Sequence, residues 1–216
     1  MISEQRLTFD DIPVIVEKCV NFIAVHGINV EGIHRLSGTA SKVKQLFDDF
    51  QRDPYSVHLR IEDYCVHDVA SVLRKFLRQL KEPLITTELR SSFIEASCVQ
   101  EAGTRHLQCK LLLRQLPLIN YRTLRKILSH LKYVADNCQT NMMNVQNLSA
   151  IFGPTLFTVD RDDIEGINFT STSQAILLTA DMILYFNWLF DVDEAELAKE
   201  IIIQQVAKDL TQHQTK

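Results

Sequence analysis

The segment 32–38 places one arginine, Arg35, between two glycines, Gly32 and Gly38, directly before a predicted helix. Glycine reaches backbone conformations that other residues avoid, so a loop of this kind can hold a side chain away from the body of the protein. A guanidinium is a permanent planar cation that can bridge two anionic oxygens. Two interpretations stay open on these residues alone: a surface turn with a solvated arginine, or a group that meets an acidic surface or a phosphate on a partner.

A second basic group lies on the predicted helix around residues 69–80. Arg74 and Arg78 are four residues apart, so they share one helix face, opposite the apolar side chains, and Lys75 adjoins them. This face is either an ordinary solvated surface or a support for a neighbouring loop.

Two asparagines stand among apolar residues in the segment 141–154. Asn141 and Asn147 each carry an amide that can both donate and accept hydrogen bonds. Such a side chain is either buried and satisfied locally or exposed as a contact at a helix edge.

Several chemistries are excluded by spacing. The glycines of 32–38 do not form G-x4-G-K-[ST], so no nucleotide site of the protein's own is expected. The seven histidines and five cysteines show no zinc-ligand spacing, so we expect no metal site and no cofactor of its own.

Composition indicates one soluble globular domain of 216 residues, 46% hydrophobic, with a net charge of −4. Charge is uneven, because residues 35–132 hold 17 basic and 10 acidic side chains, a surplus of 7. A basic middle suits an acidic partner surface or a phosphate, whereas the net charge argues against general nucleic-acid binding. No apolar stretch is long enough for membrane insertion, and the odd number of scattered cysteines favours a reducing, cytoplasmic setting.

The elements that must position these residues have helical periodicity throughout, so the predicted fold class is all-α. We expect loops at the Asp53–Pro54, Glu82–Pro83, Leu116–Pro117 and Gly153–Pro154 pairs and a surface loop over 158–173. The predicted division is an N-terminal flank at 1–11, one domain at 12–190 and a C-terminal helical extension at 191–216, which includes a helix over 194–210.

Four segments together resemble the RhoGAP domain, the GTPase-activating module for Rho-type small GTPases. They are GIHRLSG at 32–38, LRKFLRQLKEPL at 73–84, NYRTLRKILSHL at 120–131 and NMMNVQNLSAIFGPTL at 141–156. The wording of 11–27 and 190–197 looks closest to the branch that also carries ArfGAP, ankyrin-repeat and PH domains. The resemblance implies a single helical bundle of about eight or nine helices.

The resemblance also implies a role for each candidate residue. Arg35 occupies the position of an arginine finger, on a loop bracketed by Gly32 and Gly38. Arg78 matches the arginine that braces this loop. Arg74, with Lys75 beside it, and Asn147 match contacts to the GTPase, and His34 replaces a usual aromatic residue.

The implied partner is a Rho-family GTPase of the Rho, Rac or Cdc type in its GTP form. That partner carries the GTP and Mg²⁺, and this chain acts in trans, as a monomeric domain that other domains of a longer protein could recruit to membranes. A catalytically weak or inactive RhoGAP-like module that only binds a GTPase or another protein is the alternative. A basic domain that binds nucleic acid or phosphoinositide is a third interpretation.

Overall fold

A computed structural model describes Ile2, residues 5–157 and 169–193, and the single residues 195, 198, 199, 202 and 206. Within these residues the chain forms ten helices and no strand, with one isolated β-bridge between Leu7 and Pro13. The all-α prediction is confirmed. The helices are α1 (Val14–His26), α2 (Ala40–Arg52), α3 (Val66–Arg78), α4 (Thr87–Ser97), α5 (Ala102–Leu113), α6 (Leu118–Asp136), α7 (Cys138–Asn141), α8 (Val145–Phe157), α9 (Phe169–Leu184) and α10 (Phe186–Leu189).

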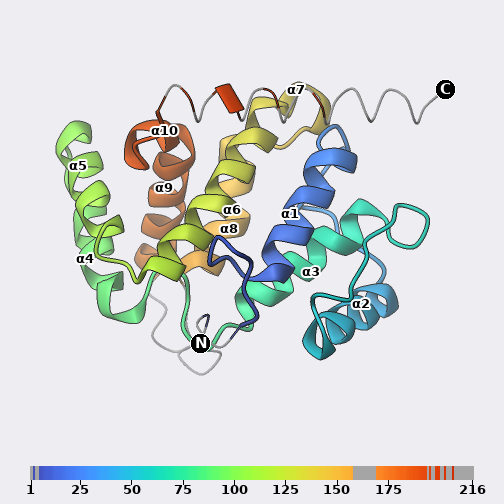
Figure 1. The fold of residues 1–216 in the computed structure, drawn as a ribbon. Helices are drawn as coiled ribbons and strands as arrows, with labels where there is room; N and C mark the ends of the chain where they lie inside the picture. Colours follow the sequence, from blue (N-terminus) through green and yellow to red (C-terminus); the bar gives the residue numbers. More distant parts are fainter. Residues whose placement is uncertain are drawn as a thin grey trace.

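The helices form one bundle in which α6 is central and contacts α1, α8 and α9 (Figure 1). The other large contacts join α8 to α9, α1 to α3 and α2 to α3. Helix α2 lies at one end of the bundle, and α4 and α5 lie at the other.

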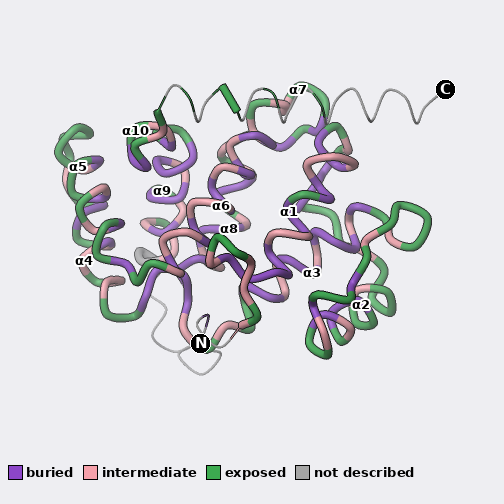
Figure 2. Tube along the Cα trace, viewed as in Figure 1, coloured by how far each residue is buried: buried purple, intermediate pink, exposed green. Residues whose placement is uncertain are grey.

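The core consists of the apolar stripes that the sequence predicted. On α3, side chains three and four residues apart are buried, including Val69, Leu73, Phe76 and Leu77. Each such side chain contributes roughly 1.5–3 kcal/mol relative to an exposed one. Buried residues are concentrated in the middle of the bundle, and many residues of α2, α4 and α5 are exposed (Figure 2). The helical face opposite the α3 stripe is therefore left for Arg74 and Arg78.

Two predicted loop boundaries differ from the structure. Gly153 and Pro154 lie inside α8, where a loop was predicted. A β-carbon at Gly153 would come 3.0 Å from the backbone of Ile176, so glycine permits close packing of α8 on α9. This tertiary packing holds the helix together although Pro154 donates no backbone hydrogen bond. Of the predicted loop 158–173, residues 169–173 belong to α9 and 158–168 lie outside the described residues.

The segment 87–97 forms α4, which carries no clear apolar stripe, and the sequence did not predict it. The predicted helix over 194–210 lies outside the described residues except for five single positions.

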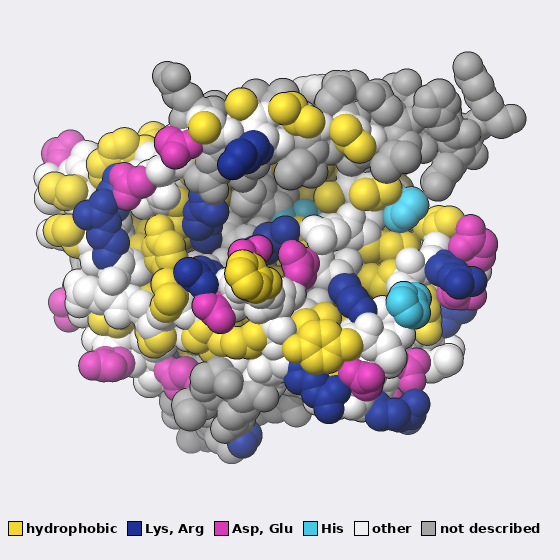
Figure 3. Space-filling model, viewed as in Figure 1, with side chains coloured by type: hydrophobic (Ala, Val, Ile, Leu, Met, Phe, Trp, Pro, Cys, Tyr) yellow, Lys and Arg dark blue, Asp and Glu magenta, His cyan; other side chains and the backbone are white. Residues whose placement is uncertain are grey.

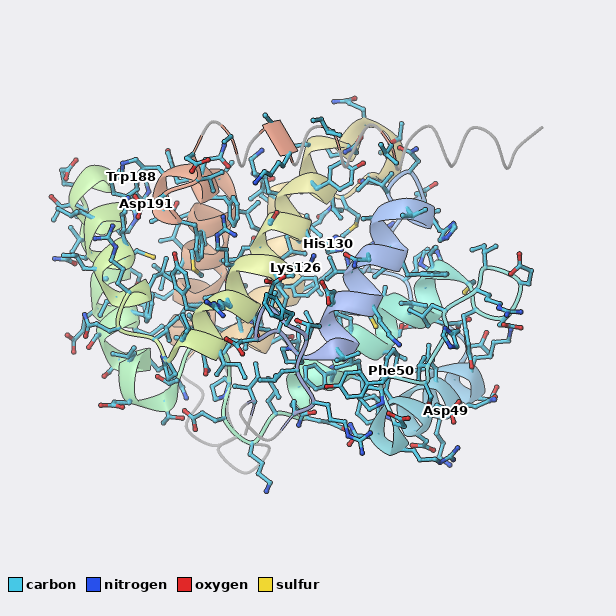
Figure 4. The ribbon with its side chains drawn as sticks, in the orientation of Figure 1. Asp49, Phe50, Lys126, His130, Trp188 and Asp191 are labelled. Carbon is cyan, nitrogen blue, oxygen red and sulfur yellow. The ribbon has the colours of Figure 1, made fainter. Side chains whose placement is uncertain are left out.

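The chain after α10 is tied to α5. The Lys110 ammonium donates hydrogen bonds to the Asp191 carboxylate at 2.5 Å and to the Trp188 carbonyl at 2.6 Å. Arg114 donates to the same carboxylate at 2.8 Å. These two cations lower the pKa of Asp191. Figure 4 shows Trp188 and Asp191 together at the α5 end of the bundle.

Candidate functional site

The segment 32–39, here called the Arg35 loop, connects α1 to α2 and is tied at its first residue to α7. Gly32 has a φ of +68°, and its amide donates to the carbonyl oxygen of Asn141 at 2.8 Å. The amides of Arg35 and Leu36 both donate to the Gly32 carbonyl at 2.8 Å. The predicted loop is thus a tight turn, and a left-handed glycine begins it.

The other end of the Arg35 loop is tied to α3. The Gly38 amide donates to Ser71 Oγ at 3.0 Å, and the Thr39 amide donates to Asp68 Oδ1 at 2.7 Å. The second oxygen of Asp68 accepts the Cys65 amide at 3.0 Å, which completes a capping box for α3. One carboxylate therefore begins α3 and fixes the end of the loop. Thr39 is the N-cap residue of α2, but its hydroxyl makes no capping hydrogen bond.

Arg35 itself is exposed. Within the described part of the chain its guanidinium makes no hydrogen bond and no ion pair. A β-carbon at Gly32 would lie 2.8 Å from Leu36 Cγ and 3.5 Å from Nη2 of Arg35. A side chain at Gly32 would be strained by this φ and would displace Leu36, so glycine suits the turn that presents the free cation.

Arg74 and Arg78 occupy different environments on the same face of α3. Arg74 is half-buried and donates from Nη2 to the Leu36 carbonyl and to Ser71 Oγ, both at 3.2 Å. Burial, and then the neighbouring charge of Arg78, lower the pKa of Arg74. Arg78 is exposed, with no hydrogen bond or ion pair to any described residue.

This arrangement differs from the support of the Arg35 loop that the resemblance implied. Arg78 was expected to brace the Arg35 loop, but in the structure the hydrogen bond to the loop comes from Arg74. The reason is position, because Arg74 lies beside Ser71 on the turn of α3 that faces the loop, whereas Arg78 is the last residue of the helix.

Lys75 points to α2. Its ammonium lies 4.3 Å from the centroid of the Phe47 ring, and the side chain is half-buried. The interaction is a cation–π contact in the packing of α2 on α3. The structure does not bring Lys75 together with Arg35.

Both asparagines make local hydrogen bonds, and a contact of Asn147 with a partner stays a prediction. Asn141 is fully buried and satisfied, since its Nδ2 donates to the carbonyls of Ile28 and Val134 and its Oδ1 accepts the Met143 amide. Asn147 is half-buried and donates from Nδ2 to the Met142 carbonyl at 3.1 Å. Because Met142 adjoins the residue that receives the Gly32 amide, Asn147 is linked to the Arg35 loop through the backbone.

His34 is a site residue whose role the sequence did not reveal. It is fully buried directly before the exposed Arg35, with φ +66° and with its Nε2 2.8 Å from Nε2 of His130 on α6. The replacement of an aromatic residue by histidine at 34 was visible in the sequence. Its partner, 96 positions away, was not.

Charges of both signs are interspersed on the face shown in Figure 3, where basic and acidic side chains alternate. The basic surplus of residues 35–132 thus does not gather into one patch on this face. Among the described residues, no three His, Cys, Asp or Glu side chains are grouped as metal ligands. No described helix has the length and apolarity to cross a membrane.

Comparison with known proteins identifies related domains. The family model of the RhoGAP domain matches residues 13–161. The mouse protein "Arf-GAP with Rho-GAP domain, ANK repeat and PH domain-containing protein 3" is 33% identical over 159 residues, covering 74% of this chain and 10% of that protein. Human unconventional myosin-IXa is also 33% identical, over 205 residues, covering 92% of this chain and 8% of that protein. The chain thus spans about a tenth of the length of these curated relatives.

Solved structures show the same fold. The BH domain of GRAF, the GTPase regulator associated with focal adhesion kinase, has a TM-score of 0.74 at 28% identity, covering 83% of this chain and 94% of that chain. Human Rho GTPase activating protein 15 has a TM-score of 0.75 at 28% identity, covering 83% of this chain and 84% of that chain. By the family model, the relatives and the fold, this chain belongs to the RhoGAP domain family.

Proposed function

We propose that this chain stimulates GTP hydrolysis on a Rho-family small GTPase by inserting Arg35 into the partner's active site. The observation that carries this proposal is the contrast within the Arg35 loop. The Arg35 guanidinium is exposed and free of partners among the described residues, while the surrounding backbone is hydrogen-bonded to α3 and α7. The relatives include proteins named Rho GTPase-activating protein 23 and 35, which supports the assignment.

The chemistry asked of Arg35 is electrostatic. During hydrolysis, charge spreads over the transferring phosphoryl oxygens, and a guanidinium offered in trans neutralises it. Such an arginine accelerates hydrolysis by about 10³–10⁵-fold. The GTP and Mg²⁺ belong to the partner, and this chain supplies a cation on a preorganised backbone, so little ordering is required at the moment of reaction.

The GTPase would be bound by side chains around the Arg35 loop. Arg78 is an exposed cation at the end of α3, suited to an acidic surface on the partner. Asn147 is held beside the loop by its bond to Met142. Arg74, which holds the Leu36 carbonyl, sets the loop itself. The partner would be a Rho-, Rac- or Cdc-type GTPase in its GTP form, bound by one copy of this domain.

The test is single-turnover hydrolysis of GTP by purified Rho-, Rac- and Cdc-type GTPases, with the wild type, Arg35→Ala, Arg35→Lys or no addition. We expect the wild type to accelerate at least one GTPase and Arg35→Ala to lose about 10³-fold or more of that effect. Arg35→Lys should restore little of the acceleration, because an ammonium cannot bridge two oxygens as the planar guanidinium does. Arg114→Ala is the matched control, since it removes an exposed arginine at the α5 end of the bundle.

Binding separates the alternatives. Arg35→Ala should still bind the GTPase loaded with a non-hydrolysable GTP analogue, in a complex that light scattering shows to contain one copy of each protein. Binding of the wild type without acceleration would make the chain an interaction module, and failure to bind any of the three GTPases would overturn the proposal.

A further inference from the structure

The residue directly before Arg35 is held in an unfavourable backbone conformation. His34 has a φ of +66°, in the left-handed region, where residues other than glycine are uncommon. This conformation costs on the order of 1 kcal/mol, so neighbouring contacts must maintain it. His34 is also fully buried, as is Ile33 before it, and the exposed residues 35–37 follow directly. Its side chain therefore anchors the loop in the core while the next side chain points to solvent.

The anchor is a hydrogen bond between two imidazoles. Nε2 of His34 lies 2.8 Å from Nε2 of His130, so one ring donates and the other accepts. The rings are nearly perpendicular, and the edge of His34 also meets Phe152 of α8 with ring centroids 5.2 Å apart. Figure 4 shows His130 on α6, the central helix of the bundle. The Arg35 loop is thus held by α6 and α8 as well as by α3 and α7.

The pair is neutral at physiological pH. Protonating the accepting ring would place hydrogen on both facing nitrogens and break the bond. Burial lowers the pKa of His130 to about 3 and moves the pKa of His34 well below its usual range. Neighbouring charges act in the same direction: Lys126 of α6 lowers the pKa of His130, and His130, Arg74 and His67 each lower that of His34.

We propose that the His34–His130 hydrogen bond positions Arg35: it fixes the backbone before Arg35 in the left-handed conformation and so sets the direction in which the guanidinium leaves the loop. This inference rests on the proposed function. Both histidines act through Arg35 and are positioning residues, which touch neither nucleotide nor partner in the reaction.

The kinetic test is a double-mutant cycle with His34→Leu, His130→Leu and the double variant, each in single-turnover hydrolysis at varied concentrations of the chain. Each single variant should lower the maximal rate about 10–100-fold, since a displacement of about 1 Å is enough for such a loss. The concentration for half-maximal rate should change little, because Arg78 and Asn147 are untouched. The second substitution should add little to the first, because both break one bond.

A matched control separates positioning from lost stability. His106→Phe replaces another buried histidine, on α5, where it packs on Tyr185. This variant should lower the melting temperature and leave the maximal rate unchanged. Two outcomes would overturn the proposal: single variants of His34 and His130 that keep the wild-type rate while folded, or losses that multiply in the double variant.

A measurement without any GTPase keeps the two proposals distinguishable. In ¹⁵N relaxation experiments on the chain alone, the Arg35 amide should be ordered in the wild type and clearly less ordered in His34→Leu and His130→Leu. Imidazole ¹⁵N shifts should show one protonated and one unprotonated Nε2. If no GTPase responds to the wild type, the proposed function fails while these spectra still test positioning. Unchanged order at Arg35 in both variants would overturn the inference.

Discussion

A β-carbon on Gly38 would lie 2.5 Å from the Cα of Asp68, a distance that two unbonded carbons cannot reach. The Arg35 loop therefore meets α3 backbone against backbone. This contact lets the Gly38 and Thr39 amides reach Ser71 and Asp68.

Gly38→Ala is expected to push the end of the Arg35 loop away from α3. The two hydrogen bonds of that end would lengthen, with a loss of about 1–3 kcal/mol in the free energy of unfolding and of about 10-fold or more in GTPase activation. Urea unfolding and single-turnover hydrolysis measure the two effects. Gly103→Ala is the control, because its new methyl group would meet only the Glu101 side chain and no backbone of another helix. Equal behaviour of the two alanine variants would contradict the close contact.

Arg74 and Arg78 are expected to differ in kinetics. Arg74→Gln removes the hydrogen bond to the Leu36 carbonyl, so it should lower the maximal rate by about 5–30-fold, equivalent to about 1–2 kcal/mol. Arg78→Gln removes an exposed cation, so it should weaken docking by a similar factor at low salt and by less at high salt. Titrating each variant against a fixed GTPase concentration separates the two parameters. If Arg74→Gln weakened binding of the GTPase and left the maximal rate unchanged, Arg74 would not be the residue that supports the loop.

Lys75→Met should leave GTPase activation within about twofold of the wild type, because the ammonium packs on Phe47 and does not contact the Arg35 loop. Methionine keeps the apolar stem and loses the cation–π contact, which is worth about 0.5–1 kcal/mol at such a site. Thermal unfolding should detect this small loss. A large loss of activation with normal stability would place Lys75 at the partner interface.

Stability should fall in mild acid because of the buried histidines. The pKa of His130 is about 3 in the folded protein against 6.5 in the unfolded chain. Below pH 6.5, His130 therefore binds a proton in the unfolded chain but not in the folded protein. The free energy of unfolding is therefore unaffected by this histidine above that pH. It falls between that pH and about pH 3, by up to about 1.4 kcal/mol per pH unit for each such histidine.

The measurement is urea unfolding of the wild type and of the double variant His34→Leu/His130→Leu between about pH 7 and pH 4. The double variant should lose less free energy of unfolding over this range. His26 and His67, whose pKa values burial also lowers, are present in both proteins and cancel in the comparison. Identical slopes would show that the pair takes up protons as readily in the folded state as in the unfolded chain, which contradicts the lowered pKa values.

Much of the fold could be predicted because helical periodicity is local. The stripe containing Val69, Leu73 and Phe76 predicts a helix and its buried face with no knowledge of its partner helix. The same reasoning fails where packing overrides a local signal. Gly153 and Pro154 usually end a helix, yet α8 continues through them because Gly153 allows close contact with α9. Helix α4 has no such stripe and escaped prediction.

For the candidate site, the sequence by itself determined which residues were available: an arginine between two glycines, two arginines on one helix face, and two asparagines among apolar residues. Only the tertiary structure decided that Arg74 reaches the loop, that Lys75 turns to Phe47, and that His34 meets His130 across 96 positions of chain. The physical reason is range. A helix face is set by spacing along the chain. A hydrogen bond between distant residues requires the packed helices to be positioned with a precision of less than an ångström.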